Sequence, residues 1–123
     1  MSIIYCLIDK DNVNPWHRVK SDETFYWHHG SPMNVYLLHE NGQLEHKVVG
    51  NPLDYPGAVL HLAVPQNVWF AADLVNKNSY NLCSISVTPG FHFSDFEPIS
   101  GGKLAERFSE YKELIHKLSK SCS

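Results

Sequence analysis

The amino-acid sequence predicts an all-β domain, an antiparallel sandwich or barrel, followed by one C-terminal α-helix. Turn-forming groups of Gly, Pro, Asn and Asp recur at short intervals, and short runs rich in Ile, Val, Leu and aromatic residues lie between them. In chain order, the runs read IIYCLI, ETFYWH, NVYLLHE, EHKVVG, AVLHLAV, VWFAADLV and YNLCSISV. Short strands at such spacing are typical of sandwiches and barrels, and their periodicity does not choose between the two.

The last part of the chain follows a helical period instead. Between residues 103 and 118, apolar side chains recur at intervals of three and four, which places them on one stripe of a helix. The stripe consists of Leu104, Phe108, Tyr111, Ile115 and Leu118. We expect this helix to pack on the outside of the sheets. Residues 1–99 then form the β-barrel, and residues 1–123 form a single domain with one core.

Composition narrows the classes of function. The formal net charge of −3 and the lack of any Lys or Arg cluster argue against nucleic acid as a partner. No run approaches the roughly 20 apolar residues of a membrane span, and no signal peptide is recognisable at the N-terminus. The cysteines Cys6, Cys83 and Cys122 are odd in number and widely spaced, which argues against a disulfide framework or a zinc ribbon. A reduced, cytoplasmic location fits this pattern best.

One segment concentrates the residues that carry chemistry. In PWHRVKSDETFYWHHG, residues 15–30, His17 is followed by Val19, Glu23 and Gly30 at spacings that resemble the first motif of the cupin superfamily. The segment VPQNVWF, residues 64–70, resembles the second motif. In a metal-binding cupin, two His and the Glu of the first motif and the His of the second converge on one ion.

Of the four ligand positions, only those of His17 and Glu23 keep a ligand residue. Val19 replaces the second His, and Phe70 replaces the third. The resemblance therefore implies no tightly bound metal, since two protein ligands hold a divalent ion weakly. The residues alone leave two roles open for His17. It is either a barrel histidine that hydrogen-bonds to Glu23 or to the backbone, or a group for ligand binding or acid–base chemistry.

Four segments together resemble the cupin-5 family, also called DUF985. They read SIIYCLI, WHRVKSDETFYWHHGSPMNVYLL, AVPQNVWFAADLV and VTPGFHFSDFEP. The resemblance implies a double-stranded β-helix, the jelly-roll barrel, related in fold to the dTDP-sugar epimerases. Family members usually begin with a further helix and strand ahead of the position of Met1. Similar cupins form dimers, and an exposed sheet edge at this point favours a homodimer.

Strand alternation predicts the wall of a pocket. Successive side chains of a strand point to opposite faces, so Glu23, Phe25 and Trp27 share one face and Tyr26 and His28 share the other. We expect the inward set to form an aromatic-lined cavity with a few polar groups, the general make-up of a small-molecule site. Aromatic core packing is the alternative for Phe25 and Trp27. The inward set consists of His17, Val19, Glu23, Phe25 and Trp27, joined by Trp69 or Phe70 and by His61.

Three functions of different classes follow. The first, which we favour, is a small-molecule-binding cupin that holds a nucleotide, a nucleotide-sugar or a similar planar ligand without a tightly bound metal. The second is an epimerase or isomerase in which His17 is the general base, polarised by Glu23, and Tyr26 or Tyr5 is the acid. The third is a metal-dependent cupin enzyme that uses His17, Glu23 and a third ligand such as His61. One fold hosts all three, so architecture does not choose between them.

Overall fold

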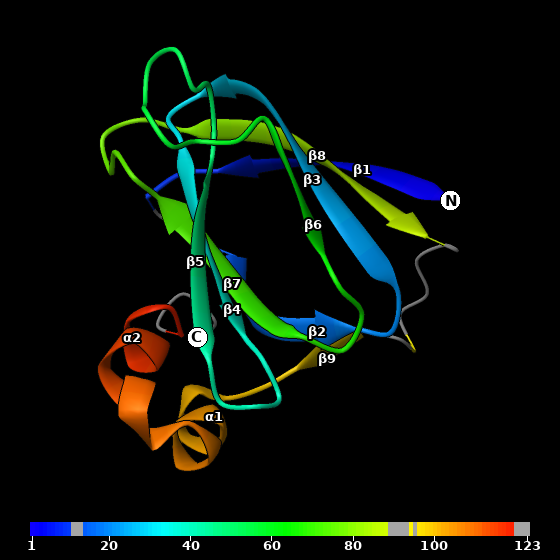
Figure 1. Ribbon diagram of the computed structural model, residues 1–123, viewed down its shortest axis with the longest axis vertical. Coiled ribbons are helices and arrows are strands. Elements are labelled where there is room, and N and C mark those ends of the chain that lie inside the picture. The colour runs from blue at the N-terminus through cyan, green and yellow to red at the C-terminus, as the bar shows by residue number, and fades with distance from the viewer. Residues whose placement is uncertain (11–13, 89–93, 95, 120–123) are drawn as a thin grey trace.

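Two antiparallel sheets face each other in the computed structural model, which describes residues 1–10, 14–88, 94 and 96–119. The first sheet has the order β1 (Ser2–Ile8), β8 (Asn81–Thr88), β3 (Asp22–Gly30) and β6 (His61–Val64). The second has the order β5 (Leu44–Val49), β4 (Met33–Leu38), β7 (Trp69–Leu74), β2 (Asn14–Val19) and β9 (Phe96–Pro98). Figure 1 shows the strands of the two sheets facing each other. The predicted all-β architecture is confirmed.

The two sheets approach each other at one pair of edges and leave a seam at the other. On the first side, the N–H of Val59, just ahead of β6, donates to the carbonyl oxygen of Val48 in β5 at 2.9 Å, and Gly50 N–H donates back to Val59 at 2.9 Å. On the second side, β1 and β9 are edge strands, and no strand pairing joins them among the described residues. The barrel is therefore open between β1 and β9.

The main core fills the space between the sheets. Its members alternate along their strands with exposed or half-buried residues, as in β4, where Met33, Val35 and Leu37 are fully buried. The inward face of β3 contributes Phe25, which is 0% exposed. The period of two that the apolar runs show in the sequence thus produces this core directly.

Gly30 ends β3 for a steric reason. Its φ of +95° lies in the left-handed region, and a Cβ at this position would stand 2.1 Å from the carbonyl oxygen of Tyr80. Only glycine accepts both constraints without a shift of the backbone. The last residue of the first motif is therefore needed for the turn into β4.

The helical C-terminal segment is confirmed, but it is not one continuous helix. It consists of α1 (Gly101–Arg107), a 3₁₀ turn η2 (Ser109–Tyr111) and α2 (Lys112–Lys117). Phe108 interrupts it with φ −130° and ψ 58°. No helix among the described residues is long and apolar enough to cross a membrane.

A second core explains the interruption. Leu104 of α1 and Ile115 of α2 are both 0% exposed, and both pack in one cluster with Trp16 and Trp69 from the outer face of the second sheet. The indole N–H of Trp16 also donates to the carbonyl oxygen of Ile115 at 3.2 Å. Two short helices can both cover this curved surface, as Figure 1 shows beside β4 and β7. The predicted stripe is buried at Leu104, Phe108, Ile115 and Leu118 and partly buried at Tyr111, although the predicted helix is broken.

Candidate functional site

A cavity of about 350 Å³ opens at the seam between β1 and β9. The first sheet contributes residues of β1, β3 and β8 to its wall, and the second sheet contributes residues of β2 and β9. The lining residues are Ile4, Tyr5, Cys6, Leu7, Ile8, Asn14, Pro15, His17, Val19, Glu23, Ile85, Val87 and Phe96. Most of the wall is apolar, and the His17 and Glu23 of the first motif are both part of it.

His17 is held in one orientation by the backbone and by two aromatic rings. Its Nδ1 lies 2.8 Å from the carbonyl oxygen of Pro15, which only accepts, so Nδ1 carries the hydrogen and donates. The ring packs against Phe70 at 4.2 Å and against Phe96 at 5.1 Å between ring centroids. Burial lowers the pKa of His17, which keeps the ring neutral. Nε2 is therefore an acceptor with no hydrogen-bond partner among the described residues.

Glu23 places a carboxyl group in the buried wall of the cavity. It is 6% exposed, and it makes no hydrogen bond or ion pair with the described part of the chain. Burial disfavours the charged form, and it raises the pKa of Glu23 from 4.5 to about 7. Glu23 is thus a carboxylic acid over part of the neutral range, and it has a hydrogen to donate. The backbone of Pro15, rather than Glu23, orients His17.

The predicted inward set divides into wall and core. Val19 lines the cavity beside His17. Phe25 and Phe70 lie behind the wall, where their rings meet edge to face at 5.8 Å and pack in the main core. Trp27 packs against the same core and donates its indole N–H to the carbonyl oxygen of Gly30 at 3.3 Å. Phe25 and Trp27 therefore serve as core packing, the alternative to a pocket role. Of the adjacent residues Trp69 and Phe70, Phe70 is the one that faces inward.

Two predicted pocket residues point elsewhere and are corrected here. Trp69 precedes the inward Phe70 in β7, so alternation turns it outward into the second core beneath the helices. His61 is exposed, because Val64 is the buried residue of β6 and His61 lies on the opposite face. Its ring stacks on Tyr26 at 6.3 Å on the outer face of the first sheet. Tyr26 is therefore also turned away from His17, as alternation predicts, and it does not serve as the acid of an epimerase.

The donor set does not fit the metal site of a metal-binding cupin. Val19 and Phe70 carry no donor atom at two of the four ligand positions, and the outward-facing His61 does not replace them. Within the described residues, no three His, Cys, Asp or Glu side chains gather closely enough to hold one ion.

Arg18 illustrates how charge is kept out of the cavity. It follows His17 in β2 and points to the opposite face, where its Nε donates to Glu97 Oε1 at 3.0 Å. Its guanidinium group lies 4.4 Å from the centre of the Trp69 ring. The nearest cation in the sequence is therefore used on the outer surface, as an ion pair and a cation–π contact.

Most of the lining residues that sequence reasoning missed come from β1 and β8. Cys6 and Ile8 of β1, with Ile85 and Val87 of β8, form the wall opposite His17. Their runs carry no motif for ligand binding, and only the pairing of the first strand with β8 brings them to the site. Asn14 also lines the cavity and was not predicted. It lies three positions before His17, outside the first motif.

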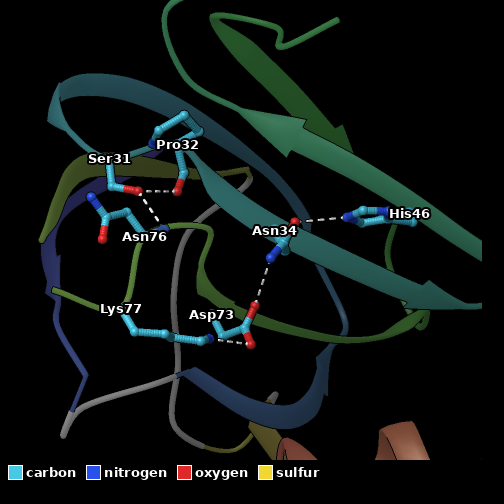
Figure 2. Close-up of polar contacts among 7 residues, drawn as sticks. All are labelled: Ser31, Pro32, Asn34, His46, Asp73, Asn76 and Lys77. Atoms are coloured by element: carbon cyan, nitrogen blue, oxygen red, sulfur yellow. Dashed lines mark hydrogen bonds and ion pairs between the residues drawn. The ribbon is translucent and has the colours of Figure 1, made fainter. Parts of the chain in front are cut away.

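A separate cluster of polar residues lies away from the cavity, and its side chains hydrogen-bond to one another (Figure 2). Asp73, 1% exposed, accepts from Lys77 Nζ at 2.7 Å and from Asn34 Nδ2 at 3.0 Å. Asn34 Oδ1 in turn accepts from His46 Nε2 at 2.8 Å. Ser31 bridges the carbonyl oxygen of Pro32 and the N–H of Asn76. Because its buried carboxylate is already paired, this cluster stabilises the sheet and is not the candidate site.

Comparisons with known proteins agree with this architecture. The family described as Cupin superfamily (DUF985) matches residues 1–99. The crystal structure of a Shewanella oneidensis protein is 30% identical with a TM-score of 0.90, over 96% of this chain and 73% of that chain. A hypothetical protein from Leishmania major is 25% identical with a TM-score of 0.85, over 95% and 74% of the two chains.

More distant likeness extends to an enzyme. A dTDP sugar isomerase from Desulfovibrio desulfuricans is 16% identical with a TM-score of 0.63, over 80% of this chain and 63% of that chain. At this identity the likeness concerns the fold alone. A search of curated proteins found no match. The match over residues 1–99 and the close structural agreement confirm the resemblance seen in the motifs, and the chain belongs to the cupin superfamily, family DUF985.

Proposed function

We propose that this chain is a small-molecule-binding cupin that holds an uncharged ring in the cavity between β1 and β9. Such a ring is the base or the sugar of a nucleotide or nucleotide-sugar, or a similar planar group. The observation that carries the proposal is the pair His17 and Glu23. Each presents a polar group that has no hydrogen-bond partner among the described residues to an otherwise largely apolar cavity.

The charge of the cavity limits what can be buried there. No Lys or Arg lines it among the described residues, and residues 11–13, 89–93 and 95 contain none in the sequence. A phosphate group inside would lose its hydration without gaining a counter-charge. Any phosphate of the ligand therefore stays outside the seam. The cavity volume, at the small end of ligand pockets, also suits one ring better than a whole nucleotide-sugar.

The hydrogen-bonding groups select the edge of that ring. Protonated Glu23 donates one hydrogen bond, and Nε2 of His17 accepts one. A ligand with a carbonyl or ring nitrogen beside a hydroxyl or N–H satisfies both. Val19, Ile85 and Val87 supply apolar contact for the rest of the ring. Leaving either polar group unsatisfied costs more than the bond itself contributes, so the pair gives specificity.

Ligand binding should depend on His17 and not on His61. A thermal-shift screen of nucleosides, nucleotides, nucleotide-sugars and simple ring compounds should find at least one compound that stabilises the protein. His17→Gln should weaken its binding at least about tenfold, because a buried hydrogen bond is lost. His61→Gln, the same change on the outer face, should leave the affinity unchanged. If no compound stabilises the protein at millimolar concentration, the proposal is wrong.

Stability should fall as the pH rises through the titration of Glu23. Because its pKa is raised from 4.5 to about 7, the folded state keeps a proton that the unfolded state releases in this window. The free energy of unfolding should decrease by about 2–3 kcal/mol between about pH 5 and pH 8, and Glu23→Gln should abolish this decrease.

Urea denaturation of both proteins across this pH range is the measurement. His17 acts in the opposite direction. Because its pKa is lowered from 6.5, its contribution to stability is present above pH 6.5 and is lost as the pH falls. Both proteins contain His17, so the difference between their free energies of unfolding at each pH reports the contribution of Glu23. A difference that does not change with pH contradicts the buried, protonated carboxyl group.

One observation favours proton-transfer chemistry as a second candidate function. An unprotonated His17 and a protonated Glu23 line the same cavity, and an acid and a base with displaced pKa values are what isomerisation next to a carbonyl requires. A bound carbonyl compound should then exchange a carbon-bound hydrogen with deuterated solvent, and His17→Gln should slow this exchange at least about 100-fold. A compound that binds to the wild-type protein without any exchange rules out this second function and leaves binding intact.

The chain also forms a homodimer in this proposal. No helix of the described residues packs on the outer face of the first sheet, and this face exposes apolar residues of its edge strand, among them Ile3 at 59% and Tyr5 at 75%. Adjacent exposed apolar residues at a sheet edge are typical of association surfaces. Light scattering should give the mass of two chains for the wild type. Tyr5→Glu should shift the mass toward one chain, whereas Leu53→Glu, in an exposed loop, should not. A wild-type mass of one chain contradicts the dimer.

A further inference from the structure

Two cysteines face each other across the β1–β8 pair at the wall of the cavity. Cys6 and Cys83 are direct partners in the antiparallel register, between the pairs Tyr5↔Ser84 and Leu7↔Leu82. Directly opposed residues of antiparallel strands have Cα atoms roughly 4.5–5.5 Å apart, which lies within the range that disulfides span. Both thiols are free in the structure. The backbone already has the spacing that a bond between them needs.

The two thiols differ in their access to small molecules. Cys6 lines the cavity and is half-buried, whereas Cys83 is 0% exposed and belongs to the main core. A reagent that enters the seam therefore meets the sulfur of Cys6 first. Cys83 does not line the cavity.

Their ionisation differs in the same direction. The Cys83 thiol donates a hydrogen bond to the sulfur of Cys6, and this lowers the pKa of Cys6 from 9.0 to about 7 despite its partial burial. The same hydrogen bond raises the pKa of Cys83 far above its ordinary value. The lowered pKa favours the thiolate of Cys6, and the thiolate is the reactive form.

We propose that Cys6 is an oxidation site of the cavity wall and that Cys83 is its resolving cysteine, so that hydrogen peroxide converts the pair into a Cys6–Cys83 disulfide. This inference goes beyond the ligand-binding function and does not depend on the identity of the ligand.

The chemistry takes two steps. The Cys6 thiolate attacks one oxygen of hydrogen peroxide, the O–O bond breaks, the sulfur is oxidised to a sulfenic acid, and hydroxide leaves. As a sulfenic acid, Cys6 no longer carries the negative charge that raised the pKa of Cys83, and the sulfur of Cys83 then attacks the sulfur of Cys6. The S–S bond forms as the S–O bond breaks, and the hydroxyl group leaves with the Cys83 proton as water. A small dithiol reverses the product by thiol–disulfide exchange.

The consequence falls on the cavity. Oxidation replaces a thiolate in the wall by a neutral disulfide and ties the edge strand β1 covalently to β8. Because β1 forms one whole side of the seam, the bond restricts the movement of that side. The redox state of the pair therefore sets both the polarity and the mobility of the wall.

The test uses the full chain carrying Cys122→Ser, which removes the third thiol from the measurement. Treatment with hydrogen peroxide, followed by digestion and mass spectrometry without reduction, should give a peptide that links Cys6 to Cys83. In the added variant Cys83→Ala, a small apolar replacement in the core, Cys6 should instead be trapped as a sulfenic acid by dimedone. Alkylation of Cys6 in the native protein should be at least about tenfold faster than that of Cys83 at neutral pH.

Three results overturn the proposal. Recovery of Cys6 as a free thiol under conditions that oxidise free cysteine means that it is not an oxidation site. Dimedone labelling of Cys6 with Cys83 still present and no linked peptide means that Cys83 does not resolve it. Faster modification of Cys83 than of Cys6 reverses the assigned roles. The dimedone measurement on Cys83→Ala keeps the role of Cys6 testable if the disulfide itself does not form.

Discussion

The pairing of β2 with β7 in the middle of the second sheet is the constraint on which the rest of the structure depends. In this pair His17 stands opposite Phe70, and both face inward. Each strand places a tryptophan, Trp16 or Trp69, on the opposite face immediately before the inward residue. The outer face of the sheet therefore carries the two indoles that the C-terminal helices cover. The inner face supplies the buried histidine of the cavity. A shift of one residue in the register would exchange the two faces.

The same burial decides the chemistry of the site. His17 and Glu23 lie in a largely apolar wall, and the neighbouring cation Arg18 is turned away to Glu97. With no charged partner for either group among the described residues, desolvation favours the neutral forms of both, so the pKa of the carboxyl rises and the pKa of the imidazole falls. A metal-binding cupin concentrates charge at this position. In this chain the pKa shifts of Glu23 and His17 favour a neutral donor and a neutral acceptor instead, which is the basis for proposing an uncharged ligand.

The edge strand β1 connects the remaining features. Its inner face forms the cavity wall opposite His17 and carries Cys6, while its outer face exposes Ile3 and Tyr5. Its pairing with β8 sets the register that opposes Cys6 to Cys83. Ligand binding, association of two chains and oxidation would therefore all act on one strand. Any of the three that changes the position of β1 changes the other two, because its two faces share one backbone.

By itself the sequence determined the family, the all-β class, the inward placement of His17, Val19 and Glu23, and the buried stripe of the C-terminal segment. These follow from motif spacing and from apolar periods of two and of about 3.6 residues. Both are visible within local segments of one sequence. Only the tertiary structure decided that Trp69 and His61 face outward, that Phe108 breaks the helix, and that β1 and β8 complete the cavity with Cys6. Which of two adjacent residues faces the core, and which distant strand becomes a neighbour, depend on pairing between segments far apart in the sequence. No local pattern carries that information.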